Sequence, residues 1–268
     1  MKTYLVTGAA SGIGAQLAMA LLQRGERVCA VDINPAPLES LKAFAATPEQ
    51  LWVTSLDVRD ASAWDGLLDQ LKQRWGQLDV LVNVAGVLKP GYCHESTAAE
   101  VDFHIDINTK GTIHGTRAAA RLMKAQGHGH IVNIASLAGI AAIPGLSLYS
   151  ASKFAVRGYT LAVAQELRDS GVKLTVVCPD AVQTPMLDLQ VDYEQAALTF
   201  SGSRSLTTHE VVDAILDRAL TRAPLEITLP ASRGFVSKLA SFFPGLSALV
   251  LDGLLKKGRQ KQQQAKQH

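Results

Sequence analysis

Apolar residues along the chain fall into two kinds of segment. Short apolar runs rich in β-branched residues predict buried strands at 3–7, 27–31, 51–56, 79–82, 131–135, 173–178 and 226–229. Between them, apolar residues recur at helical spacing, which predicts helices at 13–24, 37–46, 61–75, 149–169 and 208–220, and two helical stretches joined near Asn108 within 95–126. This alternation is typical of an α/β fold, a Rossmann-like doubly wound parallel sheet of about seven strands with helices on both faces.

Polar side chains stand where several of these strands end, namely Asp32, Asp57, Asn83 and Ser136. In a parallel α/β sheet, ligands bind beyond the carboxyl ends of the strands, where the strand order changes direction. We therefore expect the functional site along this edge of the sheet.

A glycine-rich turn, Gly8-Ala-Ala-Ser11-Gly12-Ile13-Gly14, joins the first strand to the first helix. Glycines let the backbone approach a phosphate closely, and a helix amino terminus offers free N–H groups with the positive end of the helix dipole. Asp32 follows at the end of the second strand, where an acid accepts hydrogen bonds from ribose hydroxyls and repels a 2′-phosphate. Its neighbours Ile33 and Asn34 are uncharged, so the pattern favours NAD over NADP; the alternative is an aspartate that only closes a turn or caps a helix.

Tyr149 and Lys153 are four residues apart on a predicted helix, so their side chains share one face. A nearby ammonium favours the phenolate and lowers a tyrosine pKa that is otherwise about 10. Ser136, at the end of its strand, directs a hydroxyl toward the same point. The group predicts a proton-transfer site, whereas each residue taken alone is also compatible with an ordinary structural role.

These motifs, in this order over residues 2–229, resemble the short-chain dehydrogenase/reductase family in its single-domain, non-extended form. The matching segments are Thr7-Gly8-x-x-x-Gly12-Ile13-Gly14, Asp57-Val58, Asn83-Val-Ala85-Gly86, the set Asn108, Ser136, Tyr149 and Lys153, and Pro179-x-x-Val182-x-Thr184. The resemblance implies an NAD cofactor: Asp57 and Val58 hold its adenine, the segment from Asn83 through Ala85 to Gly86 lines it, and the Pro179–Thr184 segment binds its nicotinamide amide.

The resemblance also implies the catalytic roles. Tyr149 is the general acid/base, Ser136 orients the substrate oxygen, Lys153 lowers the tyrosine pKa and binds the nicotinamide ribose, and Asn108 holds a water that relays protons from Lys153. The chain departs from the family at Asp180, where glycine is frequent, and in lacking a glycine pair after the last strand. The second departure makes a homotetramer less secure than a homodimer, and both assemblies stay open.

The catalytic domain is expected to span 1–230, with 185–205 as a lid beside the substrate, and 231–268 forms an extension. In the extension apolar residues, Leu246 among them, recur at helical spacing, and Pro244-Gly245 predicts a division into two amphipathic helices before a basic, glutamine-rich, disordered end. Two interpretations are open. The helices pack over the substrate mouth or a partner subunit, or residues 233–261 lie on an anionic membrane surface.

Composition and charge limit the partners, metals and locations that the sequence is compatible with. A formal net charge of +2 gives no argument for nucleic acid, and the three cysteines form no metal-binding cluster, which predicts free thiols and no metal. The first residues enter a strand directly and no apolar run is long enough to cross a membrane, so a cytoplasmic location is expected, with the peripheral contact above as its variant.

Apolar residues near the predicted site indicate an apolar substrate: Leu137, Ile140, Ile143, Leu146, Met186, Leu187 and Leu189. The sequence thus predicts an NAD(H)-dependent oxidoreductase that interconverts a hydrophobic secondary alcohol and its ketone or aldehyde. The alternative is a non-enzymatic dinucleotide sensor or scaffold on the same fold.

Overall fold

The protein is described by a computed structural model that covers residues 1–266, except for the side chains of 246–248. Seven parallel strands form one sheet in the order β3-β2-β1-β4-β5-β6-β7. Their bounds are β1 (Thr3–Thr7), β2 (Arg27–Asp32), β3 (Leu51–Ser55), β4 (Val80–Asn83), β5 (Gly129–Ile134), β6 (Val172–Pro179) and β7 (Glu226–Leu229). The predicted doubly wound sheet is confirmed, and the strand order reverses between β1 and β4.

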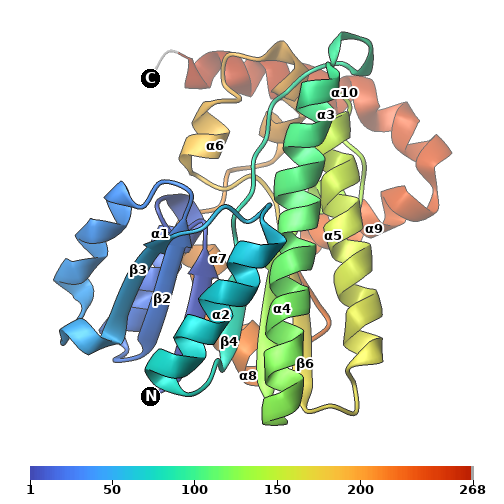
Figure 1. The fold of residues 1–268 in the computed structure, drawn as a ribbon. Coiled ribbons are helices and arrows are strands. Elements are labelled where there is room, and N and C mark those ends of the chain that lie inside the picture. The colour runs from blue at the N-terminus through green and yellow to red at the C-terminus, as the bar shows by residue number, and fades with distance from the viewer. Residues whose placement is uncertain (267–268) are drawn as a thin grey trace.

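Helices cover both faces of the sheet. They are α1 (Gly12–Gln23), α2 (Ala61–Trp75), α3 (Ala98–His104), α4 (Gly111–Gln126), α5 (Ser147–Glu166), α6 (Pro185–Asp188), α7 (Thr208–Asp213), α8 (Leu220–Arg222), α9 (Ala231–Phe242) and α10 (Pro244–Ala265). Figure 1 shows α2, α4 and α5 side by side on one face of the sheet. Trp64, Met123 and Val163 fill the core on that face, and Leu17, Leu21 and Ile215 belong to the core on the other.

Three predicted helices differ from regular α-helix. The segment Ala36–Phe44 is a 3₁₀ helix that begins after Pro35 and has Pro37 in its first turn. The helical stretch around Asn108 is a π-helical turn, Ile105–Lys110, between α3 and α4. A second π turn, Ala214–Ala219, lies between α7 and α8. Such turns often mark functional positions, and the first one carries a predicted catalytic residue.

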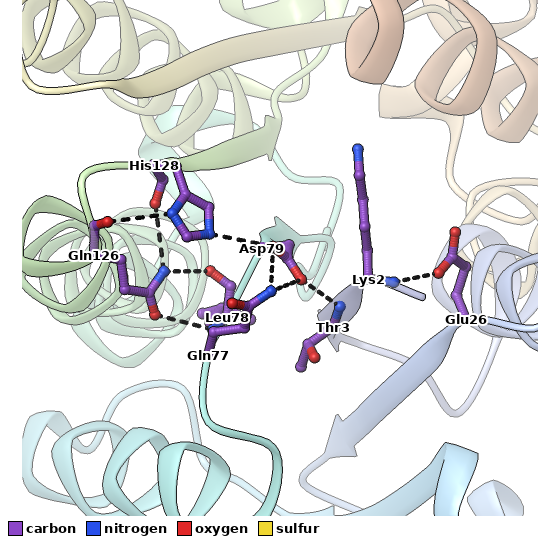
Figure 2. A network of polar contacts seen from close by, with 8 residues as sticks. All are labelled: Lys2, Thr3, Glu26, Gln77, Leu78, Asp79, Gln126 and His128. Carbon is purple, nitrogen blue, oxygen red and sulfur yellow. Dashed lines mark hydrogen bonds and ion pairs between the residues drawn. The ribbon is translucent and has the colours of Figure 1, made fainter.

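The amino ends of the strands are closed by a polar network (Figure 2). The Asp79 carboxylate accepts hydrogen bonds from the Thr3 N–H at 2.7 Å and from Gln77 Nε2 at 2.9 Å. The Gln126 side chain bonds both backbone groups of Leu78, at 3.1 Å and 3.0 Å. These contacts tie the start of β1, the approach to β4 and the end of α4 together, so this edge is sealed and the opposite, carboxyl edge is left for a ligand.

The glutamine-rich end, predicted to be disordered, continues α10 as far as Ala265. Gln262 is buried and its Nε2 donates to the backbone oxygens of Gln190 at 2.9 Å and Tyr193 at 2.7 Å, while Lys261 Nζ donates to Gly202 O at 2.5 Å. The prediction was wrong because polar side chains here bond backbone carbonyls of the 185–205 segment. Residues 267–268 and the side chain of Leu246, both part of sequence predictions, lie outside the described residues.

Candidate active site

A cavity of about 1060 Å³ lies beyond the carboxyl ends of the strands. Its volume reaches the top of the usual range of roughly 300–1,000 Å³ for ligand pockets. The predicted site residues in its wall are Gly8, Ser11, Gly12, Ile13, Asp32, Ala85, Gly86, Ser136, Tyr149, Lys153, Pro179, Val182 and Thr184. Residues separated by up to 176 positions are thus brought to one site by the parallel sheet.

Several predicted cofactor residues lie outside this wall. Ile33 is 63% exposed, and the Asp57 carboxylate is bound by Arg59, with Nη2 2.6 Å from Oδ2. The hydrogen bond from Arg59 holds the pKa of Asp57 below its usual value. Val58 instead packs against α4, where a Cβ on Gly111 would lie 2.6 Å from Val58 Cγ2.

Asn83 and Asn108 lie behind the cavity wall rather than in it. Asn83 Nδ2 donates to Asn133 Oδ1 at 2.8 Å, which links β4 to β5. Asn108 is fully buried; its Oδ1 accepts from Val87 N at 2.7 Å and its Nδ2 donates to Ser152 Oγ at 2.9 Å. Both side chains support the strand ends that carry wall residues, and Ser152 is a buried partner that the sequence did not reveal.

Gly86 separates Asn108 from Lys153. A Cβ at Gly86 would lie 3.2 Å from Asn108 Oδ1 and 3.4 Å from Lys153 Nζ. The amide of Asn108 and the ammonium of Lys153 therefore both border the position at which Gly86 lacks a side chain.

The glycine turn is shaped to receive a phosphate. Gly8 and Gly12 have φ angles of +64° and +54°, and a Cβ on Gly8 would lie 2.9 Å from Ala85 Cα. Gly14, just inside α1, packs so closely that a Cβ there would be 2.2 Å from Gly8 O. No side chain caps the amino terminus of α1 and its first turn carries no acid, so its N–H groups and positive dipole end suit a dinucleotide pyrophosphate.

Asp32 is held at the wall by backbone donors. Its Oδ2 accepts from Ala10 N and its Oδ1 from Asn34 N, both at 3.1 Å. Each carboxylate oxygen has a second lone pair free for a ligand hydroxyl. Among the described wall residues the basic side chains are Lys153 and Arg233, and each is engaged, with Ile134 O and Asp180 respectively.

Tyr149 and Lys153 meet across the first turns of α5. Lys153 Nζ donates to Ile134 O at 2.9 Å and lies 5.7 Å from the centre of the Tyr149 ring. Burial lowers the pKa of Lys153 to about 8 and raises that of Tyr149 to about 12. The net pKa of Tyr149 is therefore raised in the protein on its own, because desolvation of the phenolate outweighs the hydrogen bond from Ser136. A lowering of this pKa by Lys153 stays a prediction.

Ser136 joins the ends of β5 and β6. Its Oγ accepts from Ala138 N at 3.1 Å and donates to Pro179 O at 3.4 Å. A hydrogen bond from Ser136 lowers the pKa of Tyr149, opposing the effect of burial. Hydroxyl and phenol therefore point at one location, where an alcohol or carbonyl oxygen can be bound by both.

Asp180, the departure noted in the sequence, pairs with a residue that was not predicted. Its Oδ2 lies 2.6 Å from Arg233 Nε of α9, and its N–H donates to Leu229 O at 2.7 Å. Burial raises the pKa of Asp180, and Arg233 opposes that shift. An acid at a buried strand end requires a cationic partner, so Asp180 itself indicated that a basic residue would lie beside it. The sequence does not say which of the extension's basic residues this is.

The substrate side of the cavity is apolar and includes the extension. Six of the seven predicted apolar residues line it, whereas Leu189 is 62% exposed and does not. The additional wall residues from α9 and α10 include Val236, Leu239, Phe243, Val250, Leu251 and Leu254. The two tail helices therefore form part of the wall on the apolar side of the cavity.

Comparison with known proteins agrees with this geometry. A family model of short chain dehydrogenases matches residues 2–195. The 2-(R)-hydroxypropyl-CoM dehydrogenase of Xanthobacter autotrophicus is 34% identical over 224 residues, which are 80% of this chain and 90% of that protein. A short chain dehydrogenase/reductase of Burkholderia phymatum in complex with NAD is similar in structure, with a TM-score of 0.81 and 26% identity over 92% of this chain and 95% of its own.

A further solved structure, ElxO with NADP bound, has a TM-score of 0.75 and 28% identity over 85% of this chain and 97% of its own. Similar proteins thus carry either dinucleotide. On the sequence match, the fold and the shared site, this chain belongs to the short-chain dehydrogenase family, whose members are oxidoreductases and whose fold binds a nicotinamide dinucleotide.

Proposed function

We propose that the protein interconverts a hydrophobic secondary alcohol and its ketone or aldehyde with NAD(H), with Tyr149 as the general acid/base. This proposal rests on one cavity. In its wall, Tyr149, Ser136 and Lys153 lie between a glycine turn that can receive a phosphate and a chamber lined by apolar side chains. A sensor or scaffold has no use for a lysine kept in a buried position that lowers its pKa to about 8.

The reaction uses the chain's own residues as follows. A bound nicotinamide dinucleotide supplies the acceptor or donor of the hydride. Tyr149 takes the hydroxyl proton of the alcohol, or gives a proton to the carbonyl oxygen in the reverse direction. Ser136 turns its hydroxyl proton from Pro179 O to the same oxygen, and this hydrogen bond stabilises the charge that develops there.

Lys153 supplies a positive charge beside Tyr149. With a pKa of about 8 it is protonated at pH 7, so its charge stabilises the phenolate once the proton has moved. The buried amide of Asn108 adjoins the ammonium across Gly86, and a water relay from that point to solvent stays a prediction.

The preference for NAD rests on Asp32. A 2′-phosphate beside this carboxylate would face a like charge, which costs several kcal/mol, or a factor of about 100 or more. The two basic side chains of the described wall already have partners, so neither offers compensation.

The test is steady-state oxidation of a panel of apolar secondary alcohols with NAD and with NADP, for the native protein and for Asp32→Ala. NAD should be preferred by about 100-fold in kcat/KM, and Asp32→Ala should reduce this preference to within about tenfold. Asp60→Asn is the control, since Asp60 is an acid that caps the amino terminus of α2 and lies outside the wall. A native enzyme that prefers NADP would refute the role of Asp32, and NADH binding without turnover on any alcohol or ketone would favour the scaffold.

A further inference from the structure

The extension carries large apolar side chains that face solvent. Phe242 and Leu249 are each 79% exposed, and Phe243 and Val250 are each 57% exposed. Figure 1 shows α9 at the right of the molecule and α10 running across its top, away from the sealed amino edge of the sheet. Contiguous exposed apolar surface of this kind marks an interaction site.

This surface is continuous with the cavity. Leu239, Phe243, Val250 and Leu254 are at least 38% exposed, and the same four residues belong to the cavity wall. The apolar chamber therefore opens toward the exposed surface of the extension. An apolar substrate that enters through this opening moves from the exposed apolar surface of the extension into the apolar chamber.

Charge is distributed unevenly between the domain and the extension. Residues 1–230 hold nineteen Lys and Arg against twenty-three Asp and Glu, whereas residues 231–266 hold seven Lys and Arg and one acid, Asp252. The overall charge of +2 conceals this asymmetry. An anionic surface therefore repels the domain and attracts the extension, which orients the molecule.

Four of the extension's seven cations are used internally. Arg233 pairs with Asp180, Lys238 with Glu226 and Lys266 with Asp192, and Lys261 donates to backbone carbonyls of the 185–205 segment. Lys256, Lys257 and Arg259 are exposed and make no ion pair within the described residues. Lys256 and Lys257 follow Leu249 and Val250 by about two turns of α10, so they adjoin the exposed apolar face.

We propose that the exposed face of α9 and α10 docks on an anionic lipid bilayer and presents the cavity mouth to it. Among the described residues no helix is long and apolar enough to cross a membrane, so the contact is peripheral. Partial insertion of the apolar residues, with Lys256 and Lys257 at the headgroups, is the arrangement of an interfacial amphipathic helix. A second copy of the chain is a poorer occupant, because a two-fold contact through this face would bring the unpaired cations of both copies together.

The test is co-sedimentation of the full chain with phosphatidylcholine vesicles, with and without about 30% phosphatidylglycerol as the anionic lipid. No substrate or turnover is needed, so the result is independent of the proposed activity. Binding should require the anionic lipid and weaken as salt is raised. Lys256→Gln/Lys257→Gln should weaken it on the order of 25-fold, at about fivefold per charge.

Phe242→Glu/Leu249→Glu should abolish vesicle binding; both residues lie outside the cavity wall, so turnover of a water-soluble alcohol should be unchanged. Two matched controls should bind as the native chain does. Leu225→Glu alters a 47% exposed leucine before β7, and Lys124→Gln/Lys173→Gln removes two exposed cations from the opposite end of the sheet. Equal binding to both vesicle types would overturn the proposal, and so would a dimer in light scattering that Phe242→Glu/Leu249→Glu dissociates.

Discussion

The cofactor end of the cavity is formed mainly by backbone, whereas the substrate end is formed by apolar side chains. The cofactor end is built from backbone: the glycine turn, the open amino terminus of α1 and the strand ends held by Thr7 Oγ1, which accepts from Val84 N and Ala85 N at 3.0 Å each. The substrate end is built from apolar side chains of the 185–205 segment and of α9 and α10, which lie far from the glycine turn in the sequence.

Because of this difference, cofactor binding and substrate specificity depend on different parts of the cavity wall. Backbone geometry at the cofactor end accepts few substitutions, since a Cβ at Gly8 or Gly14 would collide with backbone atoms. Apolar side chains at the substrate end can be exchanged at modest cost as long as volume is kept. The catalytic residues stand between the two ends, so variants can be chosen that affect the reaction, one end or the other.

The largest effect is expected at the junction. Tyr149→Phe removes the acid/base hydroxyl and should lower kcat by a factor of about 10² to 10⁴. Affinity for the cofactor and for the substrate should change little, because the ring and both ends of the cavity remain. Tyr159→Phe, ten residues along the same helix and outside the wall, is the matched control and should keep full activity. Retained turnover in Tyr149→Phe would remove this residue from the mechanism.

A second effect, on stability, is expected from Lys153. Its folded-state pKa of about 8 lies below its unfolded value, so between pH 8 and 10.5 the unfolded chain holds more protons and stability rises with pH. Keeping this ammonium buried, with its pKa lowered to about 8, destabilises the folded state by about 3 kcal/mol at pH 7. Tyr149 acts in the opposite sense, but only above pH 10, because its pKa is raised to about 12.

Lys153→Met should therefore be inactive yet more stable at pH 7, by roughly 1–3 kcal/mol after the loss of one hydrogen bond to Ile134 O. Urea unfolding at pH 7 and pH 10 measures this, and the advantage of the variant should shrink at pH 10. Lys173→Met replaces an exposed lysine on β6 and should follow the native pH dependence. A Lys153→Met protein that is less stable at both pH values would show that burial of this ammonium costs little.

Most of the cofactor end could be predicted from the sequence because local patterns determine it. A strand, a glycine turn and a helix leave few arrangements of the backbone, and strand ends meet at one edge whatever their separation. Tyr149 and Lys153 share a face through helical spacing alone. The burial that sets their pKa values comes from packing of the whole chain, which is why the sequence did not reveal that the net pKa of Tyr149 is raised.

The contacts that hold the substrate end in place escaped prediction because they are long-range. The composition of the glutamine-rich end indicated disorder, but Gln262 bonds the backbone at Gln190, seventy-two positions earlier. Arg233 could not be matched to Asp180 from the sequence, since the extension offers several cations. Asp57 was assigned to the adenine by the family resemblance, and Ile33 to the cofactor as the neighbour of Asp32. Ile33 is 63% exposed and the Asp57 carboxylate is bound by Arg59, so both roles stay predictions.

The smallest effect is expected at the substrate end. Its measurement tests most directly whether the cofactor end and the substrate end of the cavity respond independently. Arg233→Met removes the cation beside Asp180 and loosens α9 where it forms the wall, so KM for an apolar alcohol should rise about tenfold, as expected for loss of a partly buried ion pair worth about 1–2 kcal/mol. KM for the cofactor and kcat should stay within about twofold. Asp180→Asn, which keeps a hydrogen-bond acceptor, should show a smaller rise.

Lys238→Met is the matched control for this prediction. Lys238 also ties α9 to the domain, through Glu226 of β7, which Arg157 binds at 2.5 Å as well, but it lies outside the cavity wall. If docking of the helix alone matters, both variants should raise the substrate KM equally. If the wall at Asp180 matters, only Arg233→Met and Asp180→Asn should do so. An equal rise in the cofactor KM would contradict the comparison itself, because the two ends of the cavity would then respond as one.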